Sequence, residues 1–393
     1  MAVNKFDNSM FDAGTIGTTA NKLLQLDGSA KIPAVDGSLI TGVPSSFTKS
    51  ASDPTLTTNP SGGVGSLWIN TTSGEAYCCT DATAGENVWT NIGAGSDNIV
   101  PWEFGGSSYG YMCGDISDHS INRFPFASDG NAVDWGDLAG TARYMKTGHS
   151  DKDNSYGYHA GGYGPPNTPI ARFSMTSSGT SNEVGDLTQI TSSAASATNA
   201  THCYTIGHEY NAGGGGDGTV VSRYAFAASV DATDWSDLMY QQYGGGGATH
   251  GAGTYGYMQG GYDTNPNHTN RIQKVNLTTA AIATDVADTT QARQAACGNS
   301  SSTHGYNHGG HMGSTSNVTD KFNMSTDANS TDVGDMLVSA HQRGGSSSLT
   351  YAYVAGSVNS VTNIDKHSFA TDGNATDVGD LAQGMVGPAG TQV

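Results

Sequence analysis

Pairs of carboxylates recur along most of the chain at a spacing that could do chemistry. The pattern is acid–x–x–acid, as in DWGDL at Asp134–Leu138 and DVGDM at Asp332–Met336. The pairs begin 49, 51, 51, 47 and 45 residues apart, and their first acids are Asp134, Glu183, Asp234, Asp285, Asp332 and Asp377. Two such carboxylates could hold a cation in every repeat, but an acid that accepts hydrogen bonds from backbone N–H groups of a turn explains the same pattern. We favour the turn acid and predict no metal site, since the spacing of an EF-hand calcium loop is absent.

A basic residue precedes each first acid by eleven positions, without exception. These residues are Arg123, Arg172, Arg223, Lys274, Lys321 and Lys366. An interval that never slips indicates one structural unit used six times. We interpret the cation and the acid as structural residues of that unit, paired between its third and fourth strands.

The pattern Tyr-x-x-Gly also occurs once in each repeat. Its tyrosines are Tyr111, Tyr158, Tyr204, Tyr257, Tyr306 and Tyr353. The interval from this tyrosine to the basic residue varies from 12 to 19 positions. Each unit therefore combines a half of fixed length with a loop of variable length.

Each unit reads as four short strands, which we name A, B, C and D in chain order. In the unit at 290–337, a run of small residues at Gln294–Ser300 predicts strand A and HGYNH at His304–His308 predicts strand B. Val318–Met324 alternates and predicts strand C, and Thr331–Met336 predicts strand D. Four strands every 45 to 51 residues are typical of the blades of a β-propeller.

The repeats resemble kelch repeats. The matching residues are YHAGG at Tyr158–Gly162, YMQGG at Tyr257–Gly261 and YNHGG at Tyr306–Gly310, each followed by a strand that carries an aromatic residue. Trp135 and Trp235 stand where kelch repeats often carry Trp. The resemblance implies an all-β fold in which residues 98–393 form a six-bladed, kelch-like β-propeller.

The end of the chain predicts how this ring would close. The sixth unit ends at Leu381, and the following AQGMVGPAGTQV occupies the strand A position of a seventh unit that does not continue. We expect this tail, or else the stretch Ile99–Ser108, to supply the first strand of the first blade. Either choice would remove an open sheet edge.

The residues before the repeats differ in character. Residues 1–45 include ANKLLQLDGSAKIPAVDGSLITG, which resembles segments of bacteriophage tail-fibre and spike proteins. That resemblance implies a segment that attaches to other virion proteins and assembles with copies of itself, for which we expect a trimer. Residues 46–60 read as a linker. Residues 61–97 predict a small β-hairpin module, with strands at Leu67–Asn70, Glu75–Cys79 and Val88–Ile92.

The composition excludes several classes of partner and function. A formal charge of −19 argues against binding nucleic acid. The sequence shows no apolar run long enough to insert into a membrane and no apolar segment of a secretory signal at its start. The five cysteines lack a disulfide or metal-binding pattern. No nucleophile elbow, phosphate loop or zinc-protease motif appears, so we predict neither an enzyme nor a cofactor.

The candidate binding residues lie in the loops between strands B and C. Because strands alternate in direction, the B–C and D–A connections must share one face of the ring. Tyrosine rings beside Asn and His suit the recognition of sugars, although tolerated loop insertions explain the same residues. The candidates are Tyr163, Asn167, His208, Tyr210, Tyr262, Asn267, His268 and His311.

Three functions remain open. The first is a bacteriophage tail fibre, spike or knob, made in the host cytoplasm and carried on the virion, whose propeller binds a glycan on the host surface. The second is a purely structural head or tail decoration protein. The third is a secreted kelch-type carbohydrate-active enzyme.

Overall fold

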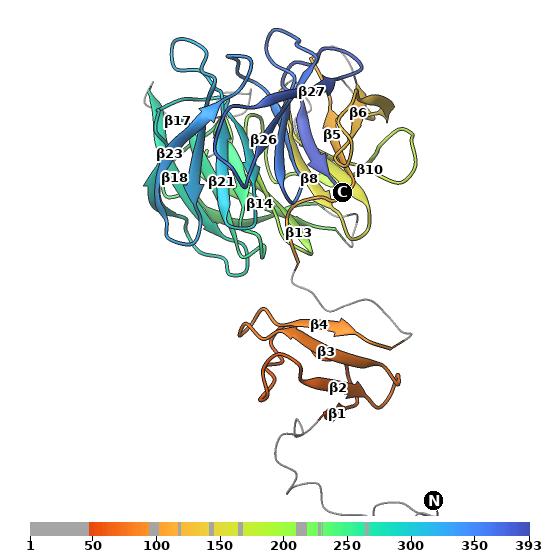
Figure 1. Ribbon diagram of the computed structural model, residues 1–393. Helices are drawn as coiled ribbons and strands as arrows, with labels where there is room; N and C mark the ends of the chain where they lie inside the picture. The colour runs from red at the N-terminus through yellow and green to blue at the C-terminus, as the bar shows by residue number, and fades with distance from the viewer. Residues whose placement is uncertain are drawn as a thin grey trace, which may run out of the picture. The chain divides into compact units, whose positions relative to one another are not determined.

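The computed structural model describes residues 47–93, 102–116, 119–140, 145–163, 168–209, 218–226, 229, 231–263 and 267–393. The chain divides into two units, Met1–Pro101 and Trp102–Val393. The described residues contain 28 strands and no helix, and the strands form seven four-stranded sheets (Figure 1). The expected all-β class is confirmed. Among the described residues, nothing helical has the length and apolar character needed to cross a membrane.

The described part of the first unit is one sheet. Its strands are β1 (Thr48–Ser50), β2 (Leu67–Asn70), β3 (Ala76–Asp81) and β4 (Val88–Asn91), paired in that order. The predicted hairpin and third strand are confirmed as β2, β3 and β4. Their shared core contains Tyr77, Cys79 and Trp89.

Residues 46–60 do not behave as the linker that the sequence predicted. Strand β1 pairs with β2 in parallel. Farther along, the buried side chain of Asn87 donates hydrogen bonds of 2.7 Å to the backbone oxygen of Leu56 and to Asn59. A buried amide needs such partners, so the segment is held against the sheet. Residues 1–45, the predicted attachment segment, lie outside the described residues.

The second unit consists of six antiparallel sheets in which strands A, B, C and D pair in that order. In the first sheet these are β28 (Ala389–Gln392), β5 (Tyr109–Cys113), β6 (Ser120–Pro125) and β7 (Val133–Asp137). The second sheet contains β8 (Thr147–Asp151), β9 (Tyr156–Ala160), β10 (Pro169–Ser174) and β11 (Asn182–Asp186). The third contains β12 (Ala195–Thr198), β13 (His202–Ile206), β14 (Val220–Ala225) and β15 (Thr233–Asp237). The fourth contains β16 (Gly246–Thr249), β17 (Tyr255–Tyr262), β18 (His268–Asn276) and β19 (Thr284–Asp288). The fifth contains β20 (Cys297–Ser300), β21 (His304–His308), β22 (Val318–Asn323) and β23 (Ala328–Asp335). The sixth contains β24 (Gly344–Ser347), β25 (Tyr351–Ala355), β26 (Asn363–Ser368) and β27 (Thr376–Asp380).

The two ends of this unit meet in the first sheet. Strand β28, from the end of the chain, pairs with β5, so the C-terminal tail supplies strand A as the first of the two alternatives predicted. The described part of the other candidate, Trp102–Ser108, instead forms a bridge from Gly106 to Ser348. The six A strands contact one another in a closed cycle, β28–β8–β12–β16–β20–β24. This arrangement is compatible with a propeller-like all-β fold.

The repeated tyrosines link each sheet to the next. All six are at most 1% exposed, and each hydroxyl donates a hydrogen bond of 2.5 to 3.4 Å to a backbone oxygen of the following sheet. The pairs are Tyr111 with Met175, Tyr158 with Phe226, Tyr204 with Leu277, Tyr257 with Met324, Tyr306 with Phe369, and Tyr353 with Phe126. The sixth bond returns to the first sheet, so the cycle is complete. The tyrosine recurs in every repeat because a buried hydroxyl requires a hydrogen-bond partner at a fixed position.

Glycine allows the A strands to approach one another closely. One equivalent position in each A strand is occupied by Gly148, Ser196, Gly247, Gly298, Gly345 and Gly390. A Cβ atom at each of Gly148, Gly247, Gly298, Gly345 and Gly390 would overlap the backbone carbonyl of the equivalent residue in the preceding sheet. We call these six residues the inner ring. Backbone therefore packs on backbone at the axis.

Side-chain oxygens accept hydrogen bonds from backbone N–H groups on the unpaired edge of these A strands. Two positions after the inner ring, backbone N–H groups donate to side-chain oxygens of a neighbouring sheet at 2.8 to 3.4 Å. The bonds run from Thr198 to Thr249, Thr249 to Ser300, Ser300 to Ser347, Ser347 to Gln392 and Gln392 to Ser150. An edge strand has unpaired N–H groups, and buried ones require partners. This explains why small polar residues follow the glycines.

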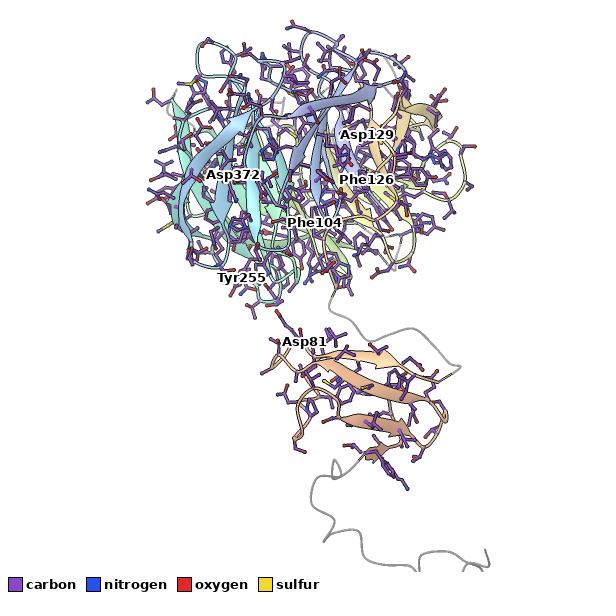
Figure 2. The ribbon with its side chains drawn as sticks, viewed as in Figure 1. Asp81, Phe104, Phe126, Asp129, Tyr255 and Asp372 are labelled. Atoms are coloured by element: carbon purple, nitrogen blue, oxygen red, sulfur yellow. The ribbon has the colours of Figure 1, made fainter. Side chains whose placement is uncertain are left out.

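The repeated cations do not pair with the acids that defined their spacing. Lys274, Lys321 and Lys366 instead form ion pairs of 2.8 to 2.9 Å with Asp327, Asp372 and Asp129 of the next sheet. Figure 2 labels two of these partners, Asp372 and Asp129. Five of the six cations also lie over a ring of their own sheet, the pairs being Arg123 with Tyr109 and Trp135, Arg172 with Tyr156, Arg223 with Trp235, Lys274 with Tyr255, and Lys366 with Tyr351. The ion pair predicted within each sheet is therefore corrected to contacts with rings and with the neighbouring sheet.

The first acids all lie in D strands, at Asp134, Glu183, Asp234, Asp285, Asp332 and Asp377. Asp134, Asp332 and Asp377 accept hydrogen bonds of 3.1 to 3.2 Å from the backbone N–H two residues later. The backbone hydrogen bond of the turn-acid interpretation is present at these three, but the acids lie in strands whose pairing has a register shift, and not in turns.

The inner ring yields a prediction about stability. In Gly298→Ala, the added methyl would overlap the backbone of Gly247, and a backbone contact at the axis cannot move without shifting a whole sheet. We expect a loss of about 3 kcal/mol or more, as for severe overpacking. The measurement is thermal unfolding by calorimetry. The control is Gly130→Ala, whose Cβ would meet open space, and equal melting of the two variants would contradict the account.

Candidate functional site

A cavity of about 550 Å³ opens on the axis of the second unit, within the size range of small-molecule sites. We call it the axial pocket. Its lining includes residues of D–A connections, such as Ser193 and Gln342, and residues of B–C connections, such as Glu209 and His311. The prediction that these two kinds of connection share a face is therefore confirmed.

Six equivalent residues surround the axial pocket at the point where each chain segment enters its A strand. All have positive φ, between 51° and 67°, and they are Met145, Ser193, Gly244, Ala295, Gln342 and Gly387. We call them the axial ring. Five backbone hydrogen bonds of 2.6 to 3.1 Å join neighbours in the ring, each from the N–H of one member to the carbonyl of another. The left-handed conformation costs a non-glycine residue about 1–2 kcal/mol, and four of the six are not glycine.

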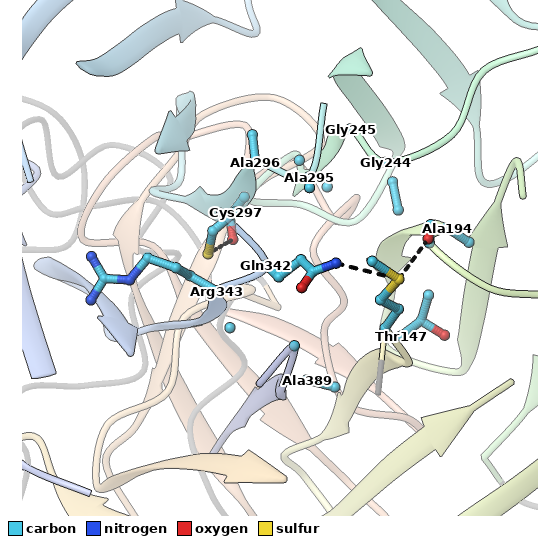
Figure 3. A pocket seen from close by; sticks show the side chains of 18 of the residues that line it. Thr147, Ala194, Gly244, Gly245, Ala295, Ala296, Cys297, Gln342, Arg343 and Ala389 are labelled. Atoms are coloured by element: carbon cyan, nitrogen blue, oxygen red, sulfur yellow. Dashed lines mark hydrogen bonds between the residues drawn. The ribbon is translucent and has the colours of Figure 1, made fainter. Parts of the chain in front are cut away.

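Two side chains of the axial ring contact a third, Met145, in the pocket. The thioether of Met145 lies 3.2 Å from the hydroxyl oxygen of Ser193 and 3.9 Å from the amide nitrogen of Gln342. Figure 3 shows Gln342 extending into the middle of the pocket toward this sulfur. We call these three side chains the polar shelf. It presents an amide, a hydroxyl and a polarisable sulfur to a ligand.

Aromatic rings line another side of the pocket mouth. Tyr243, Tyr262, His268, His311 and His341 follow one another with ring centroids 5.4, 5.3, 6.1 and 5.2 Å apart. We call them the aromatic arc, and all but His268 line the pocket. The arc comes from the fourth, fifth and sixth sheets. Three of the six sheets therefore contribute to the arc.

Backbone bridges hold the aromatic arc in place. Tyr243 and Tyr262 exchange two hydrogen bonds of 3.0 and 2.8 Å, which tie a D–A connection to the end of strand β17. Gln294 and His311 exchange an equivalent pair of 3.0 and 2.8 Å in the next sheet. The backbone of these four residues is therefore held in place. A ligand that binds there loses little free energy to ordering them.

The inner end of the pocket is closed. Beyond the inner ring lies a second cavity of only about 30 Å³, which has room for about one water molecule. The six inner-ring residues line both cavities, and Phe104 lines the smaller one. The chain enters this unit near Phe104, whose carbonyl accepts a hydrogen bond of 3.4 Å from Gln392. The axial pocket therefore opens on the face away from this entry segment.

The walls of the pocket carry little free charge. Arg343 pairs with Asp365 at 2.6 Å, and its other donors bind the carbonyls of Gly356 and Val354. Burial, and then the neighbouring His311, lower the pKa of His268 and of His341, so both imidazoles are neutral at pH 7. Burial raises the pKa of Tyr243 to about 12. Two neutral imidazoles and a neutral phenol therefore share the pocket mouth with a polar shelf, which suits an uncharged ligand with many hydroxyl groups.

The predicted binding residues separate into three groups. Tyr262 and His311 line the pocket, and His268 belongs to the aromatic arc. The prediction that Tyr262 and His268 lie in a loop is corrected, because Tyr262 ends β17 and His268 begins β18. Tyr163 and Asn267 are exposed in B–C loops outside the pocket lining. His208 is corrected, because its ring is only 2% exposed and packs beside Gln189, 3.3 Å away. Asn167 and Tyr210 lie outside the described residues.

The sequence did not indicate the D–A residues of the site. Tyr243 and His341 of the aromatic arc, Glu209 and the whole axial ring were missed. A signal did exist, because the axial ring lies ten positions after the first acid in five repeats and eleven in the first. Met, Ser, Ala and Gln are not residues that predict a positive φ, so the position was not noticed.

Exposed apolar side chains also concentrate on this face. Among the described residues of the second unit, ten large hydrophobic side chains are exposed, and seven of them lie in B–C or D–A connections. These seven are Ile116, Tyr163, Met239, Tyr240, Met312, Leu337 and Val358. Exposed apolar residues gathered around a pocket are typical of a binding face.

Buried imidazoles of this unit predict sensitivity to acid. Burial lowers the pKa of His149 to about 3 and lowers that of His159 and of His308 well below the ordinary value of 6.5. Because the unfolded chain binds these protons more readily, each group stabilises the fold fully above pH 6.5. The contribution of each imidazole to the free energy of unfolding falls by about 1.4 kcal/mol per pH unit as the pH drops below 6.5 toward the pKa of the folded state.

His159→Phe isolates this effect. His159 stacks on Phe173 at 5.6 Å, so a second ring fits the site and cannot be protonated. We expect the free energy of unfolding of the variant, measured with denaturant at several pH values, to gain on the wild type steadily between pH 6.5 and pH 5. A constant difference over this range would contradict the account.

Comparison with known proteins assigns the chain to no family. No protein-family model matches it, and no curated protein matches it. The functional argument therefore rests on the geometry of the axial pocket and on the residues around it.

Proposed function

We propose that the chain is a bacteriophage virion protein, a tail fibre, spike or knob, whose second unit is a six-bladed, kelch-like β-propeller that binds a glycan on the host surface. The observation that carries the proposal is the axial pocket, where the aromatic arc and the polar shelf share one cavity. The cycle of six tyrosine hydrogen bonds supports the propeller.

The chemistry of the pocket favours a sugar. A sugar ring has one or more apolar C–H faces that pack on aromatic rings, and hydroxyl groups that exchange hydrogen bonds with amides and hydroxyls. The aromatic arc offers the first kind of surface and the polar shelf offers the second. The formal charge of −19 disfavours nucleic acid as the ligand.

The virion role rests on the N-terminal segment. Residues 1–45 resemble attachment segments of tail-fibre and spike proteins, and we propose that they bind other virion proteins and assemble the chain as a trimer. The pocket, in turn, opens away from the segment through which the chain enters the second unit. This polarity suits a protein that is attached at one end and binds a ligand at the other.

The test uses the full chain on a glycan array of bacterial surface polysaccharides and on host cells. We expect binding to at least one surface glycan, and we expect light scattering to give the mass of three chains. Tyr262→Ala should reduce binding at least about tenfold, since aromatic anchors in pockets are worth about 2 kcal/mol or more. The matched control is Tyr163→Ala, because Tyr163 is an exposed tyrosine outside the pocket.

The alternatives predict other results. A decoration protein would bind neither glycans nor host cells, and a carbohydrate-active enzyme would release sugar from a bound glycan over time. Either result would overturn the proposed function. A single-chain mass would remove only the trimer.

A further inference from the structure

The side chains of the axial ring are retained at a cost to the fold. Gly244 and Gly387 occupy equivalent positions, so the backbone accepts glycine there. Met145, Ser193 and Gln342 nevertheless adopt positive φ angles of 56°, 54° and 56°. Glycine would relieve this strain, because it reaches the left-handed region without a steric penalty. Strain that persists at a cavity points to a role for the side chains themselves.

We propose that Met145, Ser193 and Gln342 contact the ligand directly, and that the axial pocket takes the terminal residue of an uncharged glycan, end-on. The inference rests on the proposed function and deepens it by naming the binding residues and the class of sugar. Such residues would decide which sugar binds, because they are the ones around the ring whose side chains extend beyond Cβ.

The placement of the polar shelf supports contact with a ligand. In the cycle of six sheets, Met145 precedes the second sheet, which is opposite the fifth sheet of His311. The ring members nearest the arc are Gly244 and Ala295, which have no side chain beyond Cβ, and Gln342, which directly follows His341. A ligand against the arc therefore has open space at Gly244 and Ala295, the amide of Gln342 at one end and Met145 across from it. The Gln342 amide, which projects into the pocket, could donate one hydrogen bond and accept another (Figure 3).

The closed inner end of the pocket predicts an end-on mode. A polysaccharide chain cannot pass through the inner ring, where backbone packs on backbone and the space beyond holds about one water molecule. A chain end can enter a blind pocket of about 550 Å³, whereas an internal segment needs a groove open at both ends.

The charged groups of the lining predict a neutral sugar. Those other than histidine are Lys146, Glu209 and Arg343. Arg343 is committed to Asp365, and the Glu209 carboxylate accepts a hydrogen bond of 3.2 Å from Ser192. Lys146 and Glu209 bring opposite charges to the lining. Outside its histidines the lining therefore has no excess positive charge to offset the carboxylate of an acidic sugar.

The test compares three single glycine variants of the full chain. Gln342→Gly and Met145→Gly should each raise the melting temperature by about 1–3 °C, since they relieve strain. Each should also weaken binding of a neutral sugar at least about fivefold, as expected for a lost hydrogen bond or contact in a pocket. The control is Ser155→Gly, a residue with a φ of 57° outside the pocket, which should raise the melting temperature and leave binding unchanged.

The probes are a neutral oligosaccharide from the array coupled through its reducing end, the same oligosaccharide blocked at its free end, and a counterpart that ends in a uronic acid. We expect the wild type to bind the first probe and not to bind the other two. Wild-type binding that Gln342→Gly and Met145→Gly leave intact would overturn the inference while the proposed function stands. Equal binding of the blocked or the acidic probe would overturn the end-on or the neutral part of it. A wild type that binds no glycan would overturn the proposed function as well.

Discussion

The close contact of backbone with backbone at the axis is the constraint on which the second unit depends. Gly247 and Gly298 show it most directly, because a methyl group on either would overlap the carbonyl of the neighbouring sheet. Once the A strands lie this close, the later residues of each strand can reach the next sheet, as Thr249 reaches Ser300. Farther from the axis, the repeated tyrosines reach across the same interface. The glycines of the inner ring therefore allow the A strands to meet at the axis.

The same constraint creates the site. Because the strands meet at the inner ring, the space on the axis is closed at that level and open only above it. The chain must turn sharply into each A strand there, and the left-handed axial ring makes that turn. Where the turn is made by glycine it has only a structural role. Where it is made by Met145 or Gln342 it also places a side chain in the cavity, at the cost of strain.

The sequence predicted the repeating elements well because their chemistry is local and periodic. The interval between cation and acid gave the register of strands C and D, and the tail after Leu381 predicted β28. The partners of the cations could not be predicted, since Lys274 reaches Asp327 in the next sheet and no spacing within one repeat reveals that contact. The aromatic arc was found only in part, because Tyr243 and His341 lie in connections whose conformation depends on backbone bridges and on neighbouring sheets. His208 failed for the opposite reason, as its ring is buried directly after β13.

Deletion of residues 384–393 tests the closed arrangement most directly. The deletion removes β28 and with it the strand A that pairs with β5, the inner-ring residue Gly390 and the hydrogen bonds of Gln392 to two other sheets. The first and sixth sheets would then lose their shared edge. The account predicts that calorimetry of the truncated chain shows the unfolding transition of the second unit lowered by about 10 °C or more, or lost, as for the removal of several kcal/mol from a cooperative unit. An unchanged transition would contradict it.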